Sequence, residues 1–474
     1  MDETRYASPF SRRYGRPELR ELFSERERRL LWRAVWVALA RSQERSGLLS
    51  KAEVDDLAAH QNDVDIEAAL AIEREIGHDL MAEIRVFASQ ATIGGPKLHL
   101  GATSMDVEDT VEIYRMRRAI GLIGESLHAL LAAFAARIEQ YHELVAMGYT
   151  HLQPAEPTTV GYRLAVYAAD LLIDEQQLRT AYDALAAKGI RGAVGTSASF
   201  ERLLRGSGRR ARDQEDDVLA HFDLVASDVS TQTYARKLDY LVLAALAGLG
   251  ASLSKFAADV RILSSPGFGE LFEPFGSKQV GSSSMPFKRN PVLSERICSL
   301  ARLLPGYADT AWQNAATNYL ERTLDDSANR RAILPEAFLC SDELLTLARR
   351  IVEGLRVDKG RIAQNLRTYG PFAGTEAVLM EAVKAGGDRQ ALHESLRQAA
   401  MAAYDRLAAG GDNPLAQLLV DDERLAKVLD PAEIRALLDP TDHIGDAPER
   451  ALALAARLRA LGPFPRPRSL TESA

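Results

Sequence analysis

Residues 240–254, YLVLAALAGLGASLS, form the longest uncharged run in the chain and indicate how the protein folds. A helix made from this run has no polar face, so other protein segments must cover it on all sides. The run is too short to cross a bilayer, and its alanines and glycines allow neighbouring helices to approach closely. Two arrangements remain open: a central helix within one subunit's bundle, or a helix buried between subunits.

Three long windows free of proline surround or contain this run: residues 97–153, 158–265 and 306–334. Proline breaks helix interiors, so long helices are expected in these windows. Apolar residues recur there at steps of three to four, for example from Val107 to Leu131. Alternating strand patterns and Asn-Gly or Asp-Gly hairpin turns are almost absent. The pattern predicts an all-α protein.

The length of 474 residues exceeds what one hydrophobic core usually serves. We predict an N-terminal helical domain over 1–104 and a central bundle of long helices over 105–357. A third domain of shorter helices, interrupted by Gly-Gly pairs, is expected over 358–474. The central domain contains a segment rich in glycine and proline at 264–291, and a loop of this length inside a compact protein is usually functional.

The overall charge excludes some partners. A net charge of −8 and a pI of about 5.7 give no general attraction to nucleic acid or anionic membranes. The two cysteines, Cys298 and Cys340, cannot form a disulfide framework or a cysteine-based zinc site. Residues 1–20 lack the apolar centre of a signal peptide. We therefore expect a cytoplasmic protein without nucleic-acid or membrane partners.

The most specific motif is GSSSMPFKRNP at residues 281–291. Its glycine and serines provide a mobile backbone whose amides can approach an anion. Lys288 and Asn290 follow at spacings that let the loop fold over a carboxylate. A plain Ser/Gly linker is the alternative, but linkers seldom carry such a Met-Pro-x-Lys-x-Asn-Pro tail. The segment resembles the signature loop of the fumarase/aspartase superfamily.

Two further segments resemble this superfamily in the expected order. GATS at 101–104 precedes Asp106 and Asp109, and THLQPAEPTTVG occupies 150–161. Three ordered segments at these separations are hard to obtain by chance. The resemblance implies a three-domain, all-α fold whose central helices form the core of a homotetramer. It also implies active sites shared between subunits.

Additional segments are similar to the adenylosuccinate lyase family, most of all to its animal-type branch. They are Arg13-Tyr14, His78-Asp79, Lys97–Gly101, Gln232–Lys237 and Glu321–Arg331. The last also reads as a helix N-terminus near Ser327, with Asp325 or Asp326 as its cap, which is compatible with phosphate binding. The resemblance implies β-elimination of fumarate from adenylosuccinate, and from the succinylated aminoimidazole carboxamide ribotide of purine biosynthesis.

The resemblance also implies roles for catalytic residues. Ser282 would act as the base in its alkoxide form, stabilised by loop amides and Lys288. His151 would be the general acid for the leaving nitrogen, and Glu295 would orient its ring and raise its pKa. A solvent-facing helical charge is the alternative for Glu295. His78 is expected to be a further active-site histidine.

The implied substrate carries a phosphate and two carboxylates, which arginine suits by bidentate contact. Neither a metal-ligand cluster nor a dinucleotide glycine loop is found in the sequence, so no cofactor and no metal are expected. The substrate-binding residues implied by the resemblance are Arg13, Tyr14, Asp79, His99, Thr103, Ser104, Thr150, Gln232, Ser283, Met285, Asn290, Arg296, Arg322, Ser327 and Arg331.

One position departs from the family. Members usually have Arg or Lys before the His-Asp pair, whereas this chain has Gly77. Loss of a charge-assisted phosphate contact costs roughly 1.5–3 kcal/mol, and Arg74 is a candidate replacement. Three alternatives follow: a lyase releasing fumarate from another N-succinyl compound of secondary metabolism, a non-catalytic helical bundle, and a nucleic-acid-binding scaffold. The catalytic residues and the acidic charge disfavour the last two.

Overall fold

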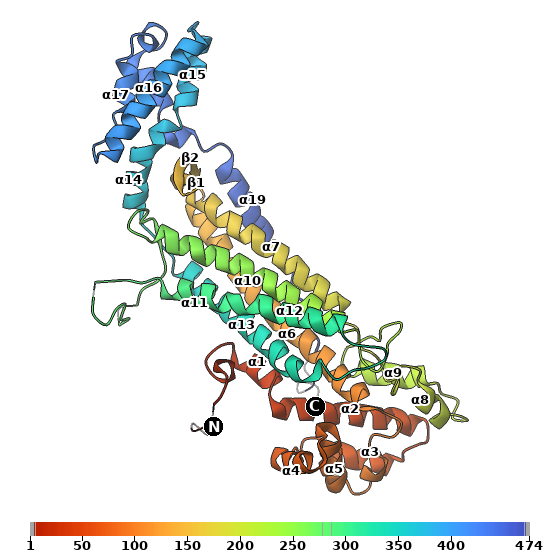
Figure 1. Ribbon diagram of the computed structural model, residues 1–474. Coiled ribbons are helices and arrows are strands. Elements are labelled where there is room, and N and C mark those ends of the chain that lie inside the picture. The colour runs from red at the N-terminus through yellow and green to blue at the C-terminus, as the bar shows by residue number, and fades with distance from the viewer. Residues whose placement is uncertain (1–3, 5, 277, 286, 469, 471–474) are drawn as a thin grey trace.

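The computed structural model describes residues 4, 6–276, 278–285, 287–468 and 470. The molecule is elongated, with a bundle of long helices in the middle (Figure 1). The N-terminal helices lie at one end of this bundle, and α15–α17 lie at the other. The prediction of an all-α fold is confirmed.

The N-terminal end is built from α1 (Pro17–Leu22), α2 (Glu25–Arg45), α3 (Lys51–Ala59), α4 (Ile66–Ile76) and α5 (Asp79–Gln90). Serine and aspartate side chains cap α2, α3 and α4. Two fully buried arginines of α2, Arg29 and Arg33, share Glu83 of α5 at 2.9 and 2.6 Å. This buried ion cluster fixes α5, and with it the His78-Asp79 pair, relative to α2.

Long helices fill the predicted proline-free windows: α6 (Ser104–Tyr141), α7 (Val160–Ala184), α10 (Lys237–Leu263), α11 (Val292–Leu300), α12 (Leu304–Ala316) and α13 (Ser327–Glu353). Ile120, Leu127 and Leu131 of α6 are fully buried, as their spacing predicts. With 38 residues, α6 spans roughly 57 Å. It therefore separates the GATS segment from the His151 segment by most of the length of the bundle.

Short elements connect the bundle helices. Strands β1 (Val145–Thr150) and β2 (Gln153–Thr159) form an antiparallel hairpin, and β3 (Leu271–Phe272) pairs with β4 (Arg356–Val357). The connection from α7 to α10 contains α8 (Ala198–Leu203) and α9 (Ala211–Ala220). Single 3₁₀ turns occupy Pro9–Ser11, Gly95–Lys97, Ala301–Leu303, Gly370–Phe372, Leu425–Lys427 and Pro440–Asp442.

The C-terminal helices are α14 (Lys359–Tyr369), α15 (Thr375–Lys384), α16 (Arg389–Ala408), α17 (Leu415–Val420), α18 (Pro431–Leu437) and α19 (Ala447–Arg459). Buried residues between Val378 and Leu438 form a hydrophobic core of their own. By contrast, α19 packs against α6 and α7 of the bundle. The chain thus returns to the central core after building the separate one.

In length and composition α6 and α10 would suit a membrane crossing, which is weak support because buried core helices share these properties. The apolar window of α10 is only 44% buried within the chain. Leu246, Leu249 and Leu253 face the core, whereas Leu241 and Ala251 are exposed. One subunit therefore does not cover this helix on all sides.

Candidate active site

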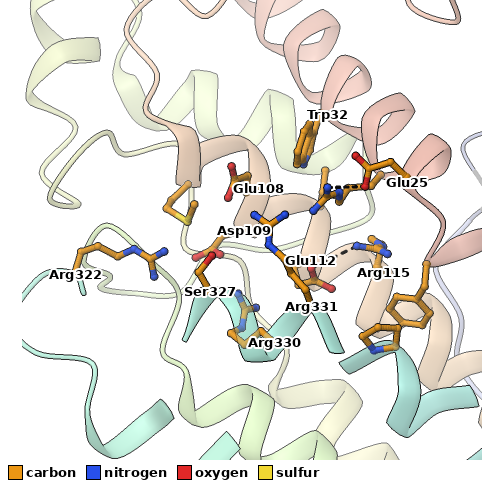
Figure 2. Close-up of a pocket in the computed structure, with 15 residues that line it drawn as sticks. Glu25, Trp32, Glu108, Asp109, Glu112, Arg115, Arg322, Ser327, Arg330 and Arg331 are labelled. Atoms are coloured by element: carbon orange, nitrogen blue, oxygen red, sulfur yellow. Dashed lines mark hydrogen bonds and ion pairs between the residues drawn. The ribbon is translucent and has the colours of Figure 1, made fainter. Parts of the chain in front are cut away.

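A cavity of about 240 Å³ lies between α2, α6 and the start of α13. Three predicted substrate-binding residues, Arg322, Ser327 and Arg331, line it together (Figure 2). Arg322 lies just before α13, Ser327 is its first residue, and Arg331 follows one turn later. Because the positive end of the helix dipole also points here, the cavity has the features of an anion-binding site.

The start of α13 is held by Asp326, in a different way from the one predicted. Asp326 occupies the N-cap position, but no side-chain capping hydrogen bond is present. Its carboxylate instead accepts hydrogen bonds from Arg236 and Arg322. The predicted capping by Asp325 or Asp326 is therefore wrong: the ion pairs with two arginines take the carboxylate that the cap would need.

Behind the cavity, a buried ion network joins three helices. Arg236, with a fully buried side chain, pairs with Asp109 of α6 at 3.1 Å as well as with Asp326. Arg330 pairs with Asp239 of α10 at 2.7 Å and donates a hydrogen bond to the Tyr234 hydroxyl. These contacts explain why the 232–237 and 321–331 segments meet, although nearly ninety positions separate them. The network sets the position of the cavity's arginines.

The His78-Asp79 pair lies at the edge of the cavity. Asp79 forms a 2.8 Å ion pair with Arg331. Burial opposes ionisation of Asp79, but the hydrogen bond and charge of Arg331 outweigh it and hold its pKa below the usual value. His78 is exposed and caps α5, where its Nδ1 accepts from the Met81 amide at 3.4 Å.

His99 has a left-handed backbone, with φ of 66°. Its Nδ1 accepts a hydrogen bond from the Trp36 indole at 2.9 Å, so Nε2 carries the proton in the neutral ring. Burial lowers the pKa of His99. At neutral pH this histidine is therefore a fixed, uncharged hydrogen-bond donor.

Thr103 and Ser104 form the start of α6. Thr103 is the N-cap, and its amide donates to the Asp106 carboxylate at 2.8 Å in a capping box. Asp106 is buried and also accepts from Lys188 and from the amide of Arg191. It anchors the connection after α7 against α6, which gives this residue a structural role.

The predicted general acid lies elsewhere. His151 occupies the turn of the β1–β2 hairpin with a left-handed φ of 54°, and both it and Thr150 are exposed. Figure 1 shows this hairpin at the end of the bundle opposite α2 and α5. Glu295, in the first turn of α11, is also exposed. Among the residues that the structure describes, no hydrogen bond or ion pair joins Glu295 to His151.

The signature loop extends away from the bundle between α10 and α11 (Figure 1). The Ser282 hydroxyl oxygen accepts from the amides of Ser284 at 3.4 Å and Met285 at 3.1 Å. Asn290 donates to the carbonyl of Gly281 at 3.0 Å and closes the loop base. Ser283, Met285 and Lys288 are exposed, and Pro286 lies outside the described residues. Two amides thus point at the oxygen that the predicted mechanism makes negative.

The remaining predicted residues do not line the cavity. Arg13 and Arg296 are exposed, and Tyr14 packs against Phe10 with ring centroids 5.6 Å apart. Gln232 donates through its side chain to the Ala193 carbonyl at 3.0 Å. One chain therefore gathers the residues at the start of α13 and leaves the serine, the histidine and the lysine elsewhere.

Sequence reasoning missed two cavity residues, Arg28 and Glu108. The Nε of Arg28 is buried and has no hydrogen-bond partner in the described part of the chain. Arg28 belongs to ERERR at 25–29, which reads as a solvated charge run. Glu108 had a usable signal, because it follows Ser104 by four residues and so shares its helix face.

The fold and the site define a lyase of the fumarase/aspartase superfamily. A family model described as "Lyase" matches residues 13–306. The structure is similar to a fumarate lyase from Mesorhizobium sp. BNC1 (TM-score 0.82, 24% identity, 95% of this chain and 99% of that one). It is also similar to the 3-carboxy-cis,cis-muconate lactonizing enzyme of Pseudomonas putida (TM-score 0.83, 26% identity, 95% and 99%).

More specific matches narrow this class. A family model described as "Adenylosuccinate lyase C-terminus" matches residues 371–451. Adenylosuccinate lyases from Schistosoma mansoni and Saccharomyces cerevisiae are each 36% identical, over 95% of this chain and 94% of theirs. The Archaeoglobus fulgidus enzyme is 35% identical, over 93% and 96%. The chain belongs to the adenylosuccinate lyase family. Since animal, fungal and archaeal members are about equally similar, the animal-type placement stays a prediction.

Proposed function

We propose that this enzyme cleaves adenylosuccinate to AMP and fumarate. The observation that carries the proposal is the cavity at the start of α13, where Arg322, Ser327 and Arg331 meet a helix N-terminus. Such an arrangement suits the phosphate of a nucleotide. Relatives bearing the adenylosuccinate lyase name match nearly the whole chain, which supports the same substrate.

The chemistry needs a base for a carbon proton and an acid for the leaving nitrogen. In our proposal Ser282 takes the proton, the electron pair of that C–H bond forms the fumarate double bond, and the C–N bond breaks. His151 gives a proton to the departing nitrogen, and Glu295 orients its ring. Loop amides that already point at the Ser282 hydroxyl, together with Lys288, would stabilise the alkoxide.

The active site that we propose is shared between subunits of a homotetramer. The cavity is smaller than pockets that enclose a whole drug-sized ligand, about 300–1,000 Å³, so it suits only part of the nucleotide. His151 and the cavity lie at opposite ends of the bundle. Exposed apolar residues on α7, α10 and α12 provide a surface for subunit packing: Val166, Ile173, Leu241 and Trp312.

The Gly77 departure is compatible with a phosphorylated substrate. Gly77 ends α4 in the left-handed conformation, with φ of 68°, which glycine adopts without strain. Arg28 supplies the cavity with a cation whose Nε still lacks a partner among the described residues. These two observations favour adenylosuccinate over a substrate without phosphate. Cleavage of the succinylated aminoimidazole carboxamide ribotide, which carries the same phosphate, belongs to the same proposal, and the cytoplasmic location stays a prediction.

The test is an assay of fumarate release. Purified protein is mixed with adenylosuccinate, and AMP formation is followed by its ultraviolet absorbance beside a Ser282→Ala variant. We expect turnover in the wild-type protein and its collapse in the variant. A folded oligomer without turnover would rule out adenylosuccinate and direct attention to other N-succinyl compounds.

A further inference from the structure

Every arginine that lines the cavity already has a protein carboxylate as partner. The distances lie between 2.6 and 3.5 Å, and several of these carboxylates belong to other helices than their arginine. The pairs are Arg28–Glu25, Arg115–Glu112, Arg322–Asp326, Arg330–Asp239 and Arg331–Asp79. The cavity is therefore not a surplus of positive charge, and its unpaired groups decide what it accepts.

Glu108 is the exception among the carboxylates of the cavity. Glu25 and Glu112 are paired with the arginines named above, and Asp109 is paired with Arg236. Within the part of the chain that the structure describes, Glu108 has neither a hydrogen bond nor an ion pair. It projects from α6 toward the cavity, as Figure 2 shows.

The charged groups around Glu108 come from four helices. Asp79 of α5 and Asp109 of α6 repel its charge, whereas Arg331 of α13 and Arg28 of α2 attract it. Burial first, and then the two aspartates, outweigh the arginines and raise the pKa of Glu108 to about 8. The other charged groups lining the cavity are Glu25, Glu112, Arg115, Arg322 and Arg330.

An ionised Glu108 would repel a phosphate, since like charges at close range disfavour each other. A neutral carboxyl has the opposite effect, because its O–H is a hydrogen-bond donor. The groups beside it are also donors: the Ser327 hydroxyl, the arginines, and the Arg28 Nε that lacks a partner among the described residues. The cavity then presents donors from three helices to one anion.

We propose that Glu108 is a substrate-binding residue whose protonated carboxyl donates a hydrogen bond to the phosphate of the nucleotide. The proposal rests on the proposed function, because the phosphate is that of adenylosuccinate or AMP. No bond is made or broken; a proton stays on Glu108 when the nucleotide binds. Binding is consequently linked to protonation and weakens as Glu108 ionises.

The experiment measures AMP binding to the intact oligomer by calorimetry between about pH 7 and pH 9. The second ionisation of phosphate lies near pH 6, so AMP is a dianion throughout this range. With the pKa of Glu108 near 8, we expect the dissociation constant to rise about tenfold across the range. Buffers of different ionisation enthalpy should reveal proton uptake at the alkaline end.

Two variants assign this dependence. Glu108→Gln keeps the shape and a donor but cannot ionise, so its pH dependence should disappear. Glu112→Gln changes a carboxylate one turn away that is already paired, so the pH dependence should persist. Adenosine, which lacks phosphate, should bind the wild-type protein without pH dependence.

Two results would overturn the inference: a wild-type dissociation constant that does not change with pH, or an unchanged dependence in Glu108→Gln. The first needs no variant, so a folding defect of Glu108→Gln cannot obscure the answer. Normal cleavage of adenylosuccinate with either result would contradict only the role of Glu108. Absence of both cleavage and AMP binding in the folded wild-type protein would contradict the proposed function as well.

Discussion

Arg331 of α13 and Asp79 of α5 form a 2.8 Å ion pair between residues 252 positions apart in the sequence. This contact closes the cavity where the bundle meets the N-terminal helices. It also links the residue beside His78 to the helix that carries Ser327. The predicted phosphate site therefore depends on how these two parts of the chain pack.

Arg331→Ala should weaken substrate binding. The loss of a charge-assisted contact costs about 1.5–3 kcal/mol, so KM should rise by roughly ten- to a hundredfold, with a smaller change in kcat. Arg349→Ala is the matched control, because Arg349 lies on the same helix and pairs only with Glu353 at the surface. Steady-state kinetics of both variants give the answer, and an equal KM in the two would contradict phosphate binding by Arg331.

Arg236→Ala should destabilise the protein. It would leave Asp109 and Asp326 buried without their main partner, and breaking a buried ion pair typically costs about 3–5 kcal/mol. Urea unfolding followed by circular dichroism measures this change. Lys237→Ala, at the exposed neighbouring position, should be nearly neutral. A loss of activity at unchanged stability would mean that Arg236 serves the substrate rather than the scaffold.

Glu108→Gln should stabilise the protein without ligand at alkaline pH. The folded pKa of about 8 lies above the model value of 4.5, so the folded state holds a proton that the unfolded chain releases. Stability from this group is complete below about pH 4.5 and falls as the pH rises through 8. The melting temperature of the variant should therefore exceed that of the wild-type protein at pH 8 and match it near pH 4.5. Identical pH profiles would show that Glu108 titrates normally.

A shared active site predicts complementation between inactive variants. Ser282→Ala and His151→Ala should each be inactive alone, because each lacks one side of the proton transfer. Mixed oligomers, formed by partial denaturation and renaturation together, should regain activity at sites that contain an intact copy of both residues. A mixture that exchanges subunits but stays inactive would place the whole site within one chain.

Much of the fold could be predicted from the sequence. Proline-free windows and the apolar spacing from Val107 to Leu131 act locally, so they placed α6 and its buried face correctly. The cap of α13 could not be predicted in this way. Asp326 has the right position for a cap, but Arg236, ninety residues earlier in the chain, takes its carboxylate. A tertiary contact of this kind has no local signal.

The site was predictable only in part, for a related reason. Arg322, Ser327 and Arg331 lie within ten positions, so one helix start brings them together. Arg28 looks like part of a solvated charge run, and only the packing of α2 against α6 places it in the cavity. Ser282 and His151 belong to segments that a single chain keeps apart, and their meeting depends on assembly.

The central claim is that this enzyme cleaves a succinylated nucleotide whose phosphate occupies the cavity at the start of α13. The most direct measurement compares kcat/KM for adenylosuccinate with kcat/KM for succinyladenosine, which is the same compound without phosphate. We predict fumarate release from adenylosuccinate, with at least about a tenfold preference over succinyladenosine, the loss expected for one charge-assisted contact. Equal values for the two compounds, or no fumarate from adenylosuccinate, would contradict the account.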